Sequence, residues 1–199
     1  DDAAINTSEA SSISLTMAGA EVGATYSYSI SSSGGGTPVT GSGTISSAGQ
    51  QLSGVDVSGL SDGTLTVSLV LTDSAGNAAT AVTNTSTLDT TAASGHSISF
   101  DDSLISSSEA ASVSLTMAGA EVGATYSYSI SSSGGGTPVT GSGTISSAGQ
   151  QLSGIDVSGL SDGTLTVSLV LTDSAGNAAT AVTGSSTLDT SVPTGHSIS

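Results

Sequence analysis

Apolar and polar residues alternate along much of the chain, and this pattern sets the first expectation about its fold. Ile13, Leu15 and Met17 alternate with hydroxyl residues, and a similar alternation returns over residues 25–30 and 64–71. A period of two residues is typical of antiparallel strands that bury one face and expose the other. No stretch keeps the period of an amphipathic helix. The pattern therefore predicts an all-β protein.

Turn signals rich in Gly, Ser, Asp and Asn separate the alternating runs. The strands that they delimit in the first part of the chain are expected near residues 11–17, 24–31, 37–46, 51–57, 64–72 and 78–88. A further strand is expected at residues 96–100. An odd number of up-and-down strands places the two ends of a domain on opposite sides, as a string of domains requires. About seven short strands in roughly 100 residues predict an immunoglobulin-like sandwich.

The sequence repeats itself with a period of 100 residues. Residues 1–99 and 101–199 differ at only 13 of 99 aligned positions. This period is longer than the ~20–50 residues of a solenoid unit and matches a small domain. We therefore expect two tandem antiparallel β-sandwiches of about seven strands each. The first spans residues 1–90 and lacks its first strand, the second spans 91–192, and residues 193–199 begin a further repeat.

The charge of the chain narrows the choice of partners. There are 16 acidic residues and no Lys or Arg, so the net charge is −16. Such a surface repels nucleic-acid phosphates and anionic membranes, and no apolar run approaches the ~18 residues of a membrane span. Neither nucleic acid nor an inserted membrane segment is expected. Every carboxylate has to be solvated, hydrogen-bonded to a neutral donor, or bound to a cation.

Covalent reinforcement of the fold is excluded by composition. The chain has no Cys for a disulfide and no Lys for an isopeptide bond, and its aromatic residues are four Tyr and one Phe. The core is therefore expected to be thin and built from aliphatic side chains. Small cores without covalent links commonly rely on a bound metal, which is the remaining stabilising device here.

Acidic side chains and Asn recur in the expected turns of both copies. Strand alternation brings them together at the ends of the domains, and it places Asp89 of the linker opposite Glu121, Asp173 and Asn177. The candidate metal ligands are Asp1, Asp2, Glu9, Asp73, Asn77, Asp89, Asp101, Asp102, Glu109, Glu121, Asp173, Asn177 and Asp189. Clustered oxygen ligands suit Ca²⁺, whereas transition metals would require His or Cys. The sequence therefore predicts Ca²⁺ as the bound cofactor.

Ordinary structural roles compete with several of these assignments. Asp62 precedes Gly63 and could simply form a turn, and Asp173 could close an Asx turn without any ion. Tyr26 and Tyr28 could stack on sugars. However, they occupy the apolar positions of their alternating strand, which favours packing against the core. His96 would have to support a catalytic triad from a strand beside a linker, so an enzyme is not expected.

Three motifs occur in an order that resembles a known family. They are Asp101-Asp102-x-x-Ile105-x-x-x-Glu109-Ala110, Asp173-Ser-Ala-Gly-Asn177, and Leu188-Asp189-Thr190 before Pro193. The chain resembles the tandem bacterial immunoglobulin-like repeats of large RTX-type adhesins exported by a type I system. The resemblance implies an extracellular stalk on the bacterial surface that binds Ca²⁺ within domains and at linkers. It also implies that neighbouring repeats of the same chain are its partners, and that other domains bind the distal ligand.

Two classes of function remain open. A passive extender is favoured because duplication of nearly identical copies adds length, whereas the alternative is a glycan- or surface-binding adhesion module. Ice binding would need a regular Thr-x-Thr ladder, which is absent. The segment Gly195–Ser199 repeats Gly95–Ser99, the expected first strand of the second domain. An edge that lacks this strand can accept one from another molecule, so head-to-tail contact through residues 194–199 is expected.

Overall fold

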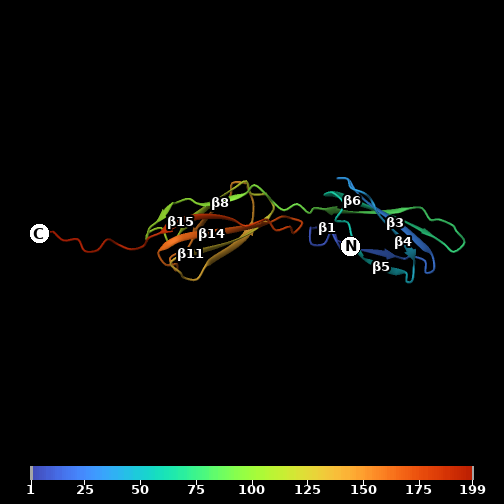
Figure 1. The fold of residues 1–199 in the computed structure, drawn as a ribbon, viewed down its shortest axis with the longest axis horizontal. Coiled ribbons are helices and arrows are strands. Elements are labelled where there is room, and N and C mark those ends of the chain that lie inside the picture. Colours follow the sequence, from blue (N-terminus) through green and yellow to red (C-terminus); the bar gives the residue numbers. More distant parts are fainter. Residues whose placement is uncertain (1, 199) are drawn as a thin grey trace. The chain divides into compact units, whose positions relative to one another are not determined.

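The computed structural model describes residues 2–198 and separates the chain into two compact units, Asp1–Thr91 and Ala92–Ser199. The described residues form strands and turns, without a helix long and apolar enough to cross a membrane. Each unit is a sandwich of two sheets (Figure 1). The expected all-β, immunoglobulin-like fold is therefore confirmed.

The second unit contains a five-stranded and a three-stranded sheet. Its strands are β8 (Ser97–Phe100), β9 (Leu104–Ile105), β10 (Val113–Ala118), β11 (Thr125–Ser132), β12 (Val139–Thr144), β13 (Gln151–Ile155), β14 (Gly163–Thr172) and β15 (Val182–Leu188). The larger sheet has the order β12-β11-β14-β15-β9 and the smaller sheet the order β13-β10-β8. Leu165, Val167 and Leu169 of β14 are fully buried, as the alternation of its sequence predicts.

The first unit repeats this plan, but its smaller sheet has two strands instead of three. Its strands are β1 (Ala4–Ile5), β2 (Ile13–Ala18), β3 (Thr25–Ser32), β4 (Val39–Thr44), β5 (Gly49–Val55), β6 (Gly63–Thr72) and β7 (Val82–Leu88). The larger sheet has the order β1-β7-β6-β3-β4, and the smaller sheet contains only β2 and β5. Within residues 2–91, no strand takes the place that β8 has beside β10 in the second unit.

The chain crosses between the sheets of the second unit over residues 101–103. β8 pairs antiparallel with β10 in the smaller sheet, and β9 then pairs parallel with β15 in the larger one. β1 and β7 form the same parallel pair in the first unit. This pairing differs from the purely antiparallel arrangement that the sequence predicts. Strands of two residues are too short to leave a periodic signal.

The last strand of each unit begins later than its sequence pattern suggests. Residues 78–81 were expected to be extended and paired, but β7 begins at Val82. Ala78 makes only an isolated bridge to Thr72, because the chain is still leaving the turn that Asp73 and Asn77 close. Turn geometry therefore delays the start of the strand ladder by several residues.

The missing strand changes how the core of the first unit is covered. In the second unit one continuous cluster includes Ile98 and Phe100 of β8. The buried residues of the first unit fall into two separate clusters, one containing Ile13 and the other containing Met17. Leu69 is only partly buried there, although its counterpart in β14 is fully buried. Equivalent residues of the two nearly identical units thus differ in burial, because only the second unit has β8 over its core.

Candidate functional site

The turn between β14 and β15 holds one of the predicted acidic groups. Asp173 Oδ1 accepts hydrogen bonds from the backbone N–H of Ala175 at 2.9 Å and of Asn177 at 2.8 Å. The side-chain amide of Asn177 donates to Asp173 Oδ2 at 2.9 Å. Asp173 is 6% exposed and Asn177 2%. The Asx turn that the sequence left open is therefore present, and it holds a buried carboxylate in a chain without basic residues.

The corresponding turn of the first unit has the same bonds in a more open setting. Asp73 accepts from the N–H groups of Ala75 and Asn77 and from the amide of Asn77, at 2.8–2.9 Å. Asp73 is only partly buried and Asn77 is exposed. The side-chain bond from Asn77, followed by the backbone bond from the same residue, lowers the pKa of Asp73 below its usual value of 3.8. The turn thus stabilises the ionised carboxylate.

Glu9 closes the turn that precedes β2, and Glu109 closes the equivalent turn before β10. Glu109 Oε2 accepts from the backbone N–H of Ser106 at 2.9 Å and from its hydroxyl at 2.7 Å. These bonds, the backbone one first, lower the pKa of Glu109. Glu9 accepts from the N–H of Asn6 at 3.0 Å. In both units the glutamate side chain thus accepts from the backbone N–H three residues before it, as the Glu of a capping box does.

Asp101 lies where the chain leaves β8 and ties together three strands of the smaller sheet. Its Oδ1 accepts from the hydroxyl of Thr116 in β10 at 2.6 Å, and its Oδ2 accepts from the side-chain amide of Gln151 in β13 at 2.5 Å. The neighbouring Asp102 is held through its backbone carbonyl, which accepts from Ser186 Oγ at 2.7 Å. Asp2 has the same backbone bond, from Ser86. Asp1 lies outside the described residues.

Asp162 links the loop before β14 to the chain that follows β15, a role that sequence reasoning missed. Its Oδ1 accepts from the N–H of Thr190 at 2.9 Å and from the Thr190 hydroxyl at 2.7 Å. The hydroxyl bond is the larger cause of the lowered pKa of Asp162. Asp189 accepts from the N–H and hydroxyl of Ser191. Asp62 and Thr90 repeat the first contact in the first unit.

The predicted ligands are therefore distributed over separate turns. Across residues 2–198, no group of three or more His, Cys, Asp or Glu side chains is placed to hold a metal. A Ca²⁺ site would need hydroxyl, amide and carbonyl oxygens to complete its six to eight ligands. The donors that the turns offer are oxygen atoms of that kind, so they fit a hard cation in type. Asp89 belongs to the first unit and Glu121, Asp173 and Asn177 to the second, so the junction site stays a prediction.

The tyrosines form a pair at the edge of each core. Tyr126 and Tyr128 stack with ring centroids 6.4 Å apart and planes 15° from parallel, and both pack against the core cluster while remaining partly buried. A Cβ atom placed on Gly141 would lie 2.5 Å from the Tyr128 ring. The glycines of β12 thus leave room for the rings. This packing against the core is the role that the alternating pattern of the strand predicts for the tyrosines.

Comparison with known proteins gives structural rather than sequence matches. No protein-family model and no curated protein matches the chain. It is 29% identical to a tetra-tandem repeat in the extending region of a large adhesion protein, with 90% of this chain and 45% of that chain covered and a TM-score of 0.45. It is 24% identical to a structure from a 1.5-MDa bacterial ice-binding adhesin, with 95% and 62% covered and a TM-score of 0.51.

Fibronectin(III)-like modules of Clostridium thermocellum CbhA are also similar, at 11% identity, 98% and 94% coverage and a TM-score of 0.47. The chain spans less than two thirds of the length of the two adhesin structures. The likeness to the ice-binding adhesin, at a TM-score of 0.51, shows a shared fold.

Proposed function

We propose that the chain is a structural extender, or stalk, segment of a long bacterial cell-surface adhesin, stiffened by Ca²⁺ within its domains and at the interdomain linker. The observation that carries this proposal is the tandem arrangement of two nearly identical sandwiches. Duplicating a unit adds length without adding a new kind of surface. Catalysis is not part of the proposed role.

The proposed setting is extracellular, after type I secretion, with neighbouring repeats of the same chain as the immediate partners. Other domains would bind the distal ligand. Head-to-tail contact through residues 194–199 belongs to the same proposal, although Ser199 lies outside the described residues. Both adhesin structures that resemble this chain support the setting through their descriptions, which name an extending region and a bacterial adhesin.

Ca²⁺ would supply the positive charge that the chain lacks. Within the second unit, Asp101, Asp102 and Glu109 precede β10, and Glu121 with the Asp173 turn lies in loops that follow β10 and β14. Their carboxylates are acceptors with no Lys or Arg anywhere in the chain to balance them. A cation would therefore lower the repulsion among them and hold turns that are otherwise closed only by neutral donors.

Calorimetric titration of Ca²⁺ into the full chain, paired with thermal unfolding in excess Ca²⁺ and in EDTA, tests the proposal. Binding to the folded state alone stabilises by about 4 kcal/mol when the free ion is ~1,000 times its Kd. Absence of binding heat together with an identical unfolding midpoint would rule out the Ca²⁺ part of the proposal.

A matched pair of variants locates the ion. Asp102→Asn should weaken Ca²⁺ binding, because it removes a charge while the hydrogen bond of Asp102 uses its backbone carbonyl. Asp156→Asn should leave binding unchanged, since Asp156 is not a candidate ligand and its Oδ1 only accepts from Ser158. Equal losses in the two variants would point to general electrostatics instead of a defined site.

A further inference from the structure

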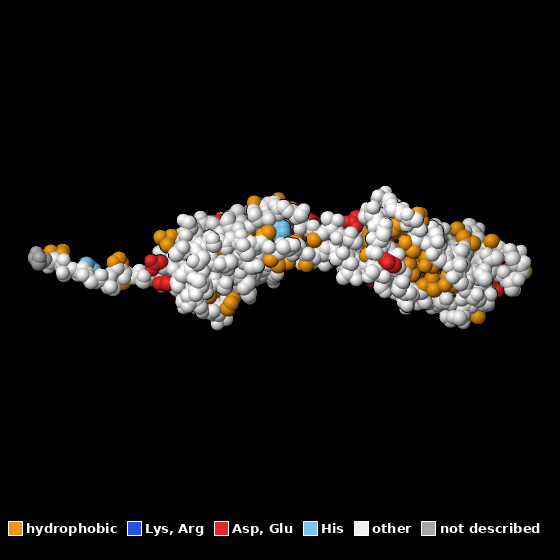
Figure 2. Space-filling view, viewed as in Figure 1, with side chains coloured by type: hydrophobic (Ala, Val, Ile, Leu, Met, Phe, Trp, Pro, Cys, Tyr) orange, Lys and Arg blue, Asp and Glu red, His pale blue; other side chains and the backbone are white. Residues whose placement is uncertain are grey.

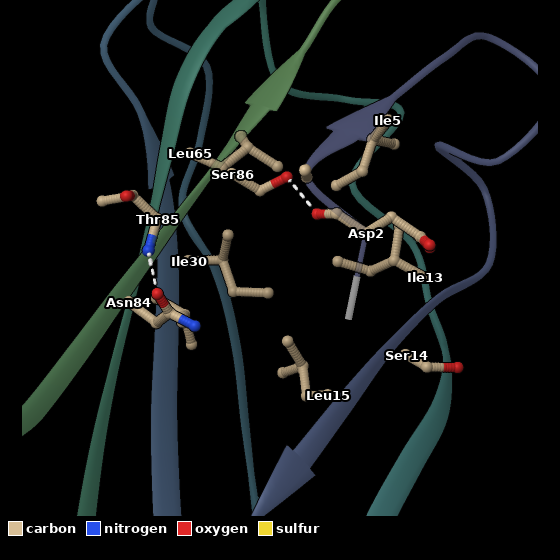
Figure 3. Close-up of a pocket in the computed structure, with 12 residues that line it drawn as sticks. Asp2, Ile5, Ile13, Ser14, Leu15, Ile30, Leu65, Asn84, Thr85 and Ser86 are labelled. Carbon is tan, nitrogen blue, oxygen red and sulfur yellow. Dashed lines mark hydrogen bonds between the residues drawn. The ribbon is translucent and has the colours of Figure 1, made fainter. Parts of the chain in front are cut away.

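The apolar hollow of about 290 Å³ on the first unit lies between β2 and β7. Figure 3 shows Ile13 and Leu15 on one side of this hollow and Asn84 on the other, and Figure 2 shows apolar side chains gathered on this unit. In the second unit, β8 lies in the equivalent place, paired with β10 and beside β15. This hollow is therefore a place for a strand of the core and not for a ligand.

A separate hollow of about 460 Å³ lies at the other edge of the same sandwich. It opens between β4, which is the edge strand of the larger sheet, and β5 of the smaller sheet. Its walls include Tyr26 and Tyr28 of β3, Ser42 of β4, Ser53 of β5, and Asp56 just after β5. All the residues around it lie within 26–56, and the place that β8 takes in the second unit is not part of it.

The two tyrosine rings form an aromatic wall of this hollow. Their centroids are 6.5 Å apart and their planes are 15° from parallel. A Cβ atom on Gly41 would lie 2.5 Å from the Tyr28 ring, so glycine at this position lets the ring lie across β4. Both tyrosines are only partly buried. The C–H groups on one face of a sugar ring pack well against the negatively polarised face of such an aromatic ring.

Groups that can hydrogen-bond a sugar surround the rings. Within residues 2–198, the hydroxyls of Tyr26 and Tyr28 make no hydrogen bond. Asp56 accepts from the N–H of Ser58 at 2.9 Å and from its hydroxyl at 2.6 Å, and both bonds use Oδ1, which leaves Oδ2 for a ligand hydroxyl. β4 and β5 are each paired on one side only, so their outer edges add backbone N–H and C=O groups.

The charges of the chain select an uncharged ligand. There is no Lys or Arg to bind a phosphate, sulfate or carboxylate group, and a net charge of −16 repels anions. Figure 2 shows acidic side chains and no basic ones on the visible face. Asp56 is the single charged residue among those that line the hollow, whereas a bound Ca²⁺ takes six to eight oxygen ligands. A neutral ligand rich in hydroxyl groups matches both the rings and the carboxylate.

We propose that this hollow binds an uncharged saccharide, one or two hexose rings at the end of a glycan. Its volume of about 460 Å³ is that of a small-ligand site. One sugar ring would stack on Tyr26 and Tyr28, and a sugar hydroxyl would donate to Asp56 Oδ2. The residues that line the hollow recur in the second unit with the single change of Val55 to Ile155, so each repeat offers the same groups. This binding goes beyond the proposed extender role and requires no Ca²⁺.

Titration of the full chain with neutral disaccharides, followed through the ring-proton resonances of its four Tyr, tests this inference. The probes are maltose, cellobiose and lactose, and at least one should shift these resonances with a Kd on the order of 1–10 mM, as expected for an open site. Anionic 3′-sialyllactose should bind at least about tenfold more weakly than the tightest of the three. Unshifted resonances at about 50 mM of every disaccharide, or equal binding of the anionic sugar, would overturn the inference.

Matched double variants locate the site. Asp56→Asn together with Asp156→Asn should weaken sugar binding about tenfold, because a hydrogen bond to an ionised acceptor is lost. Asp62→Asn together with Asp162→Asn removes the same charge outside the hollow and should leave the Kd for the sugar unchanged. Equal losses of affinity in the two double variants would assign the effect to overall charge and would overturn the inference.

Two further readouts separate this inference from the proposed function and from association between copies. Sugar binding should persist in EDTA. Loss of sugar binding in EDTA would contradict this inference, while loss of Ca²⁺ binding alone would contradict only the proposed function. Tyrosine resonances that shift with protein concentration in the absence of sugar would mean that the open edges of β4 and β5 pair between copies, which would also contradict the inference.

Discussion

Replacing Ile98 by alanine should destabilise the second unit, whereas the same replacement at Ile198 should have little effect. Ile98 is 4% exposed within the continuous core cluster, and Ile198 is 102% exposed. Truncating a buried Ile to Ala costs about 2–4 kcal/mol, and exposed substitutions stay within about 0.5 kcal/mol. Since ~1 kcal/mol moves the midpoint of a domain of this size by roughly 4–8 °C, the second unit should melt roughly 8–32 °C lower.

Amide hydrogen exchange followed by mass spectrometry can assign this loss to one unit. Residues 14–54 and 114–154 are identical, so peptides from those regions cannot be distinguished. Peptides covering residues 82–94 and 182–194 differ in sequence and report the two units separately. Protection should fall in the second of these regions for Ile98→Ala and in neither for Ile198→Ala. Equal effects of the two substitutions would refute the assignment of β8 to the core.

Three other outcomes follow from the structure. The first unit should unfold at lower urea than the second because its core is less covered, and coincident transitions would contradict this. Two hydrogen bonds from Ser158, of which the hydroxyl bond has the larger effect, lower the pKa of Asp156 below 3.8. The stabilisation that they give is therefore present above pH 3.8 and is lost as the pH falls through the native pKa. Carboxyl NMR should show that Ser158→Ala raises the pKa of Asp156, and an unchanged pKa would argue against the hydroxyl bond. Gly141→Ala should cost about 1–3 kcal/mol by crowding Tyr128, while Gly149→Ala, with open space around it, should be neutral in urea unfolding.

Much of the fold could be predicted from the sequence because period-two alternation and turn residues are local signals. The strand expected at 24–31 is β3, that at 64–72 is β6, and that at 96–100 contains β8. The parallel pairing of β9 with β15 could not be predicted, since it depends on two residues crossing between sheets. Local pattern defines strands well but does not define which sheet a short strand joins.

The candidate site was predicted in part for a similar reason. Acidic turn residues are visible in the sequence, and the Asx turn of Asp173 involves a residue only four positions away. The contact of Asp162 with Thr190 joins residues 28 positions apart and depends on the tertiary fold. The close approach of Gly184 to the backbone of Ile98 likewise follows only from where β8 lies in the fold. Contacts between distant segments leave no local signature.

The central claim, that Ca²⁺ stiffens this pair of domains into a stalk segment, is tested most directly by pulsed electron paramagnetic resonance. The chain has no Cys, so Val22→Cys and Val122→Cys introduce unique labelling sites at equivalent positions that are 61% and 62% exposed. The distance distribution between the two spin labels should be narrow in excess Ca²⁺ and broad in EDTA. A distribution of the same width in both conditions would contradict the claim.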